Sequence, residues 1–160
     1  MKKSCNALLI VILIFATCTL NTKAQTRMPD EVRNACEKYG EIYNICPEFL
    51  EAIAYEESQF NAMAVDSTKT CHGLMQIYAK YHKDRMKKLG VSNIYDIEGN
   101  INVAADYLAE LFEEYEDAGT VLMIYHGEKD AVKKSERGNL SKYAKRVLSM
   151  SEMYERAHDK

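Results

Sequence analysis

The chain has 160 residues, of which 47% are apolar and 28% are charged, with 21 Lys and Arg against 24 Asp and Glu. This composition supplies enough apolar side chains for a core and excludes wholesale disorder. The low counts of 7 Gly and 2 Pro exclude collagen-like and low-complexity sequence. The length is that of one globular domain.

Residues 1–24 have the pattern of a secretory signal peptide. A basic start precedes an apolar run over residues 7–20, and the tripeptide Thr-Lys-Ala at 22–24 places small residues where a signal peptidase cleaves. The run is shorter than the roughly 20 residues that a membrane span needs. We therefore expect an exported protein, in the periplasm or the extracellular space. Lipoprotein anchoring at Cys18 is less favoured, because bulky Phe15 replaces the usual aliphatic residue.

The mature chain is acidic. Without residues 1–24 it keeps 18 basic and 24 acidic groups, a net charge of −6. Its densest basic run, at residues 83–88, is too short to follow a phosphate backbone, so no nucleic-acid partner is expected. We expect the partner to be uncharged or weakly charged.

Three cysteines, Cys36, Cys46 and Cys71, remain after cleavage. The oxidising compartment favours one disulfide. Cys36 and Cys46 are the better pair, because they lie ten residues apart across the break between two predicted helices. The chain has neither a CxxC pair nor closely spaced histidines, so neither a metal nor a cofactor is expected.

Helical periodicity dominates residues 25–160 and predicts a single all-α domain without linkers or repeats. No alternating strand pattern is longer than about four residues. A non-periodic stretch covers residues 61–72, and a polar, charged stretch covers residues 127–138. The predicted helices cover, in chain order, residues 29–40, 47–60, 77–90, 100–117 and 121–125, and a last helix carries Tyr143, Val147, Met150 and Tyr154 on one side.

One carboxylate lies on an apolar helix face. At 100° per residue, Leu50, Ile53 and Glu57 fall within about 60° of one another, whereas Glu56 points away. A carboxylate on such a face loses hydration, which favours the neutral form that a general acid needs. The alternative is structural, since a Glu at a helix end can reach solvent or pair with a lysine.

Four short motifs follow one another between about residues 40 and 155. They are Glu57-Ser58-Gln59-Phe60-Asn61, Gly73-Leu74-Met75-Gln76-Ile77, Asn100-Ile101 with Ala104, Tyr107 and Leu108, and Tyr125-His126-Gly127. In this order they are similar to the motifs of the lytic transglycosylase, goose-type-lysozyme-like family of peptidoglycan-cleaving enzymes. The resemblance implies a lysozyme-like transglycosylase domain over residues 25–160.

The resemblance also implies roles for individual residues. Glu57 would be the catalytic group. An amide, an adaptable thioether and aromatic rings are suited to sugar contacts, although each of these residues could instead serve ordinary packing. The implied substrate-binding residues are Ser58, Ser67, Met75, Gln76, Tyr107, Tyr125 and His126.

The chain departs from the family pattern at several positions. Ala104 replaces a glycine, and His126 stands where the family usually has Asn and would add pH sensitivity to a substrate contact. The loop after Glu57 is about one residue longer than the pattern, and counting back from Gly73 selects Ser67 as its polar residue. A nucleophilic pair of the adjacent residues at 71 and 72 is disfavoured, because neighbours on a loop rarely point at each other.

The resemblance implies cleavage between N-acetylmuramic acid and N-acetylglucosamine by a single Glu. The muramic C6 hydroxyl would close the sugar into a 1,6-anhydro product, without metal or cofactor. Two alternatives remain: a muramidase in which a second acid such as Asp66 directs water, and an inactive cell-wall binding or assembly protein, which His126 would mark. We expect a monomer that acts on glycan strands, in a small form suited to recruitment by a cell-envelope secretion or conjugation apparatus.

Overall fold

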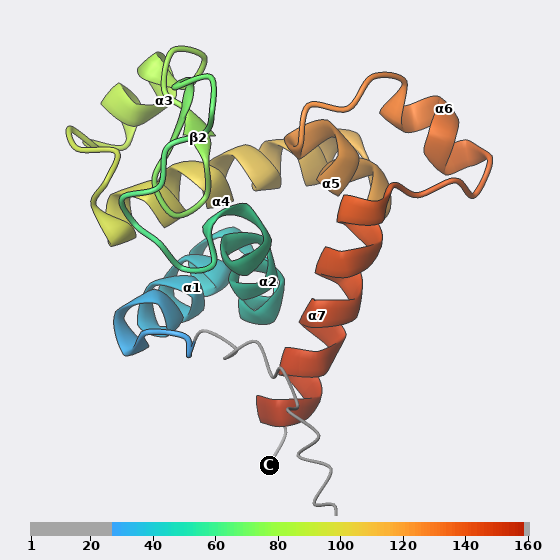
Figure 1. Cartoon of the computed structure of the whole chain (residues 1–160), viewed down its shortest axis with the longest axis horizontal. Coiled ribbons are helices and arrows are strands. Elements are labelled where there is room, and N and C mark those ends of the chain that lie inside the picture. Colours follow the sequence, from blue (N-terminus) through green and yellow to red (C-terminus); the bar gives the residue numbers. More distant parts are fainter. Residues whose placement is uncertain (1–26, 159–160) are drawn as a thin grey trace, which may run out of the picture.

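The computed structural model describes residues 27–158, so the predicted signal peptide and Cys18 lie outside the described residues. The described residues form helices and one short hairpin (Figure 1), which confirms the all-α prediction. No helix among them is long and apolar enough to cross a membrane. The elements are α1 (Asp30–Tyr43), α2 (Pro47–Ser58), β1 (Cys71–His72), β2 (Ile77–Tyr78), α3 (Lys83–Lys88), α4 (Ile97–Glu114), α5 (Ala118–Tyr125), α6 (Ala131–Glu136) and α7 (Lys142–His158).

The ends of the main helices follow from local sequence. α2 begins with Pro47 in its first turn, where the missing N–H costs nothing, and it ends where Gln59 adopts a left-handed conformation at φ 53°. α4 and α5 each begin after an aspartate, Asp96 and Asp117, whose side chain accepts a hydrogen bond from a backbone N–H three residues on. The two aspartates thus set where α4 and α5 begin, and Gln59 sets where α2 ends.

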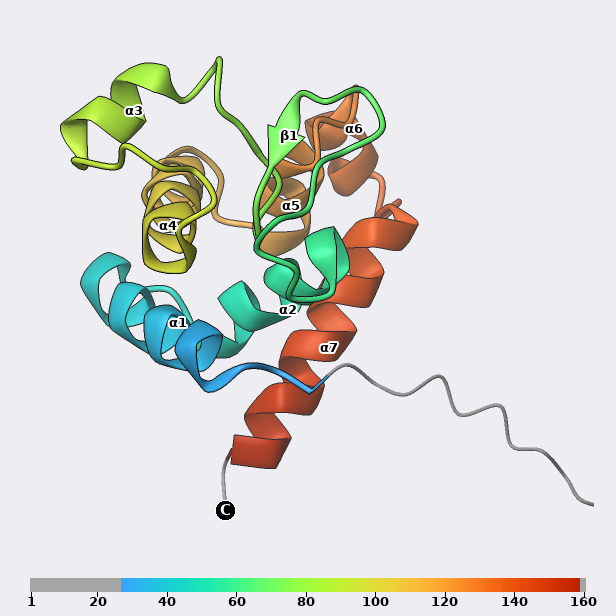
Figure 2. The same cartoon turned by 60° about the vertical axis from the view of Figure 1, so that its left-hand side comes forward.

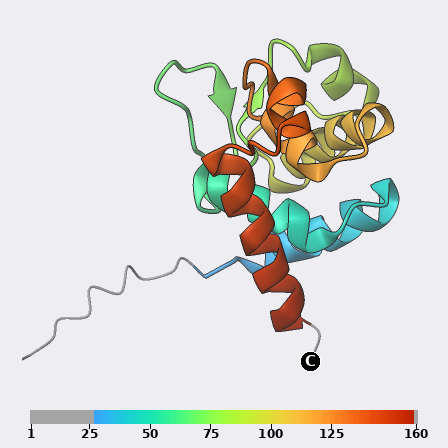
Figure 3. The ribbon, with the colours of Figure 1, turned by 90° about the vertical axis from the view of Figure 1, so that its right-hand side faces the viewer.

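α2 lies at the centre of the fold, between α1 and α7 (Figure 3). α4 packs on α1, and in Figure 1 the hairpin and α3 stand at one end of α4 while α5 and α6 stand at the other. Burying each large apolar side chain in this core contributes roughly 1.5–3 kcal/mol. The fully buried residues include Leu50, Ile53, Ile101, Leu108 and Leu122.

Several predicted helix boundaries were wrong. α4 and α5 each begin three residues earlier than predicted, α4 ends three residues earlier, and α6 lies where no helix was predicted. α1 continues past Gly40, because this glycine permits close packing: a Cβ there would lie 2.7 Å from the Ile45 carbonyl oxygen and 3.1 Å from Pro47. The predicted helix over residues 77–90 is reduced to α3. Its first two residues form β2 instead, because the chain turns back at Gln76, with φ 47°, and pairs with β1. Figure 2 shows this hairpin above the end of α2.

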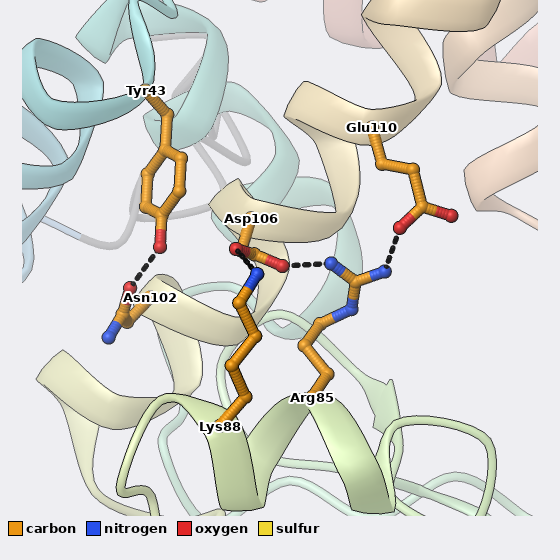
Figure 4. Close-up of polar contacts among 6 residues, drawn as sticks. All are labelled: Tyr43, Arg85, Lys88, Asn102, Asp106 and Glu110. Atoms are coloured by element: carbon orange, nitrogen blue, oxygen red, sulfur yellow. Dashed lines mark hydrogen bonds and ion pairs between the residues drawn. The ribbon is translucent and has the colours of Figure 1, made fainter.

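α3 has no fully buried residue; Met86 packs partly against the core, and charged side chains tie the helix to α4. Arg85 contacts Asp106 of α4 and donates a hydrogen bond of 2.5 Å to Glu110, and Lys88 lies 3.5 Å from Asp106 (Figure 4). Both Arg85 and Asp106 are largely shielded, at 15% and 13% side-chain exposure. This network fixes α3 against α4 as one wall of the groove described below.

The predicted disulfide between Cys36 and Cys46 is absent. These two cysteines and Cys71 are free thiols in the described part of the chain. Cys36 is fully buried in the core on α1, whereas Cys46 is exposed before α2, where its Sγ lies 3.0 Å from an oxygen of Glu48. The two thiols therefore occupy different environments, which their spacing in sequence could not reveal.

Candidate active site

A groove of about 780 Å³ opens where the end of α2, the hairpin, α3, α4 and α5 meet. Its wall combines carboxylates with aromatic rings, a composition suited to sugars because rings supply flat apolar faces and carboxylates supply hydrogen-bond acceptors. The lining residues are Glu57, Cys71, Gln76, Ile77, Tyr78, Tyr81, His82, Asp84, Arg85, Tyr107, Glu110, Ile124, Tyr125, His126 and Gly127.

Glu57 lies in the last turn of α2 with its side chain only 12% exposed. Its Oε1 accepts a hydrogen bond of 2.6 Å from the Tyr143 hydroxyl, and the His126 Nδ1 lies 3.7 Å from the same oxygen. Glu56 faces elsewhere, where Arg146 donates a hydrogen bond of 2.7 Å to it. The two adjacent glutamates are thus separated as the helical-face argument predicted, with Glu57 alone in the groove.

Tyr143 is the neighbour of Glu57 that sequence analysis missed, because its apolar stripe on the last helix indicated only core packing. The residue is 5% exposed on α7, and burial raises the pKa of its hydroxyl far above the usual range, so it remains a neutral donor. Its ring stacks on the His126 imidazole, with centroids 3.9 Å apart and planes at 10°. Tyr143 therefore supports both the carboxylate and the histidine.

Tyr125, Tyr107 and Tyr81 form an aromatic wall of the groove. The Tyr125 hydroxyl donates a hydrogen bond of 2.7 Å to the carbonyl oxygen of Met75, which joins α5 to the hairpin. The Tyr107 ring lies 5.9 Å from Tyr125 and 4.7 Å from His82. Tyr81, which is 80% exposed, extends this wall to the rim of the groove. The positions of His82 and Tyr81 gave no signal in the sequence analysis.

Asn100 organises the turn between the two strands. Its side-chain oxygen accepts a hydrogen bond of 2.7 Å from the Met75 N–H, and its side-chain nitrogen donates one of 2.7 Å to the Ile94 carbonyl. Gly73 has φ 78°, and a Cβ at this position would collide with the Asn100 side chain. Only glycine at position 73 leaves room for the Asn100 side chain. Met75 is buried and contributes its backbone, rather than its side chain, to the site.

Four of the predicted substrate-binding residues line the groove: Gln76, Tyr107, Tyr125 and His126. The other three do not line it. Met75 is fully buried, the Ser58 hydroxyl donates a hydrogen bond of 3.1 Å to Ala54 in its own helix, and Ser67 is exposed on the loop before β1. A sugar contact at these three residues stays a prediction.

Asp66, the second acid of the muramidase alternative, is not a lining residue of the groove. Its oxygens accept hydrogen bonds from Thr68 and from the backbone N–H groups of Thr70 and Cys71, at 2.6 Å and 2.7 Å for the last two. The Thr68 side chain and these amides hold the pKa of Asp66 far below its usual range. Asp66 therefore organises its own loop. No group of three His, Cys, Asp or Glu residues in the described ranges could hold a metal ion.

The helical fold and the groove around Glu57 define a lysozyme-like domain. Residues 34–147 match the family model described as Transglycosylase SLT domain, and the chain belongs to this family.

Three relatives share about a third of their aligned residues with this chain. Protein IpgF of Shigella sonnei is 33% identical over 107 residues, 63% of this chain and 70% of that protein. A transglycosylase of Enterobacteria phage PRD1 is 34% identical over 85 residues, 53% of this chain and 30% of the phage protein. The membrane-bound lytic murein transglycosylase F of Desulfosudis oleivorans is 32% identical over 101 residues, 61% of this chain and 21% of that protein. The chain thus spans less than a third of the length of the last two relatives.

Proposed function

We propose that this protein is a peptidoglycan lytic transglycosylase in which Glu57 cleaves the bond between N-acetylmuramic acid and N-acetylglucosamine. The observation that carries the proposal is the position of Glu57: it is a shielded carboxylate, held by Tyr143, in a groove lined by aromatic rings. Family membership and the relatives named as transglycosylases support the same activity.

In the proposed mechanism, protonated Glu57 donates its proton to the glycosidic oxygen as the bond from muramic C1 to that oxygen breaks. The substrate's own acetamido group stabilises the positive charge at C1. The Glu57 carboxylate then accepts the proton of the muramic C6 hydroxyl, whose oxygen bonds to C1 and closes the 1,6-anhydro ring. One carboxyl group therefore acts first as acid and then as base, and Tyr143 keeps it in place for both steps.

Product analysis tests this function. Purified peptidoglycan is digested with residues 25–160, and the muropeptides are weighed by mass spectrometry. We expect 1,6-anhydro-muramic ends. A hydrolytic muramidase would instead produce reducing ends heavier by one water, and a binding protein would sediment with peptidoglycan without cleaving it.

Paired substitutions test the role of Glu57. Glu57→Gln keeps the shape of the side chain but cannot donate a proton, so we expect kcat to fall by about 10²-fold or more. Glu56→Gln is the matched control on the same helix turn, and it should remain active because Glu56 pairs with Arg146 outside the groove. Equal losses in the two variants would reject the assignment of Glu57.

We also propose that the protein meets its substrate after export, with glycan strands as its partner. The apolar segment at residues 7–20 supports this proposal. Fractionation of expressing cells and N-terminal sequencing of the mature form should find the chain outside the cytoplasm and beginning at residue 25. A full-length cytoplasmic chain would contradict the export proposal.

A further inference from the structure

His126 lies next to Glu57, just beyond hydrogen-bonding distance of its carboxylate. Its Nδ1 is 3.7 Å from the Glu57 Oε1, and the ring is held parallel to Tyr143, whose hydroxyl donates to that same oxygen. The His126 side chain is 45% exposed toward the groove, whereas that of Glu57 is 12% exposed. A small rotation of the half-exposed imidazole brings its N–H within hydrogen-bonding distance of the carboxylate.

The charges around His126 favour its protonated form. The interaction with the negatively charged Glu57 carboxylate, 3.7 Å from the ring Nδ1, raises the pKa of His126 above its ordinary 6.5, against the opposing effect of burial. Glu128 acts in the same direction and Arg146 opposes it. Arg146 is itself paired with Glu56 at 2.7 Å, which reduces its effect. The His126 ring therefore holds its proton more tightly than an isolated imidazole does.

We propose that His126 supplies the proton with which Glu57 attacks the glycosidic bond, and that substrate binding triggers the transfer. This inference rests on the proposed transglycosylase function. A sugar in the groove covers the exposed part of the His126 ring and removes water from the pair. Because desolvation penalises separated charges, the neutral imidazole and carboxylic acid become favoured over the ion pair.

The proton returns to its source in each cycle. His126 loses the proton on Nδ1, keeps the one on Nε2 and becomes neutral, while Glu57 gains the proton. A half-turn of the carboxyl group turns its O–H to the groove and leaves the other oxygen to accept from Tyr143. Glu57 then protonates the leaving glycosidic oxygen, removes the proton of the C6 hydroxyl as C1–O6 forms, and passes it back to His126 when the product leaves.

This arrangement predicts how activity depends on pH. The free enzyme is competent while the pair keeps its shared proton, so the alkaline limb of kcat/KM should follow the titration of His126, above its ordinary value of 6.5. In His126→Asn and His126→Gln the pair has lost its imidazole proton donor. Their alkaline limb should therefore move to lower pH than that of the wild type, so that activity lost near neutral pH recovers as the pH falls.

The experiment measures kcat/KM on purified glycan strands between about pH 5 and pH 9 for the wild type and the variants. His82→Asn is the matched control, because His82 lines the same groove next to Tyr107. It should keep the alkaline limb of the wild type, whatever its effect on KM. An unmoved limb in both His126 variants would overturn the proposal, as would an equal displacement in His82→Asn.

An NMR titration provides a readout that a structural role would not change. The carbon-bound ring proton of His126 is followed against pH in the Glu57→Gln protein and in the wild type, each with and without tri-N-acetylglucosamine. In the wild type the titration midpoint of His126 should fall when the sugar binds, and Glu57→Gln should lower it without sugar. A midpoint unaffected by either change would reject the proton transfer. Failure of the proposed function is distinct, because it shows as reducing ends, as binding without cleavage, or as an active Glu57→Gln protein, and none of these readouts depends on the titration of His126.

Discussion

Glu51 provides a stability test that is independent of catalysis. The residue lies within α2 with a fully buried side chain, and neither of its oxygens has a hydrogen-bond partner in the described structure. A cationic form of His158 would be a distant partner, with its Nε2 4.0 Å from the carboxyl group. Burial raises the pKa of Glu51 from 4.5 to about 7, against the opposing charges of His158 and Arg33, while Glu48 and Glu37 reinforce the rise.

The sign of the effect follows from this rise. The folded protein binds the Glu51 proton more tightly than the unfolded chain does. The stabilisation from this proton is therefore complete below pH 4.5 and is lost as the pH rises through about 7. At about 1.4 kcal/mol per unit, the loss amounts to about 3 kcal/mol. Glu51→Gln removes this titration. Its stability relative to the wild type should therefore improve by about 3 kcal/mol between about pH 4.5 and about pH 8.

Urea unfolding at those two pH values measures the difference. Glu48→Gln, on the preceding turn, is the control, because its effect on stability should depend on pH in the opposite direction. Burial works to raise the pKa of Glu48, but hydrogen bonds from Cys46 and His158 lower it on balance. Ionised Glu48 therefore stabilises the fold at pH values above the ordinary pKa of a carboxyl group. Its replacement by Gln should lower the free energy of unfolding at the higher of the two pH values. If Glu51→Gln differed from the wild type by the same amount at both pH values, the assigned effect of burial would be refuted.

Three further substitutions test the construction of the site. Gly73→Ala forces a side chain onto a backbone with φ 78° and against Asn100, so we expect urea unfolding to show a loss of about 2–4 kcal/mol, and wild-type stability would contradict the packing. Tyr143→Phe removes the hydroxyl that holds Glu57, and muropeptide release should show kcat reduced about tenfold with little change in KM, whereas an unchanged kcat would exclude this support. Tyr81→Ala removes an 80% exposed ring at the groove rim, so KM should rise while the free energy of unfolding changes by less than about 0.5 kcal/mol, and the reverse pattern would show that the ring serves folding.

The amino-acid sequence alone determined the helix faces, the start of α2 and the family motifs, because these features depend on residues close together in the chain. The apolar periodicity of α2 placed Glu57 and Glu56 on different faces, because side-chain direction in a helix is fixed by 3.6 residues per turn. Pro47 indicated where that helix begins. The four motifs, taken in order, predicted the family, and four of the seven predicted substrate-binding residues line the groove.

Tertiary structure alone decided which distant residues meet. The Glu57–Tyr143 hydrogen bond joins residues 86 positions apart, and it exists because α7 packs against α2. The packing of α5 against α7 places the His126 ring against Tyr143, which makes His126 a neighbour of the carboxylate rather than a sugar contact alone. Residues 77–78 pair as a strand instead of starting a helix, because Asn100 of α4 fixes the turn that precedes them. Such contacts depend on how helices dock, and no local periodicity records that docking.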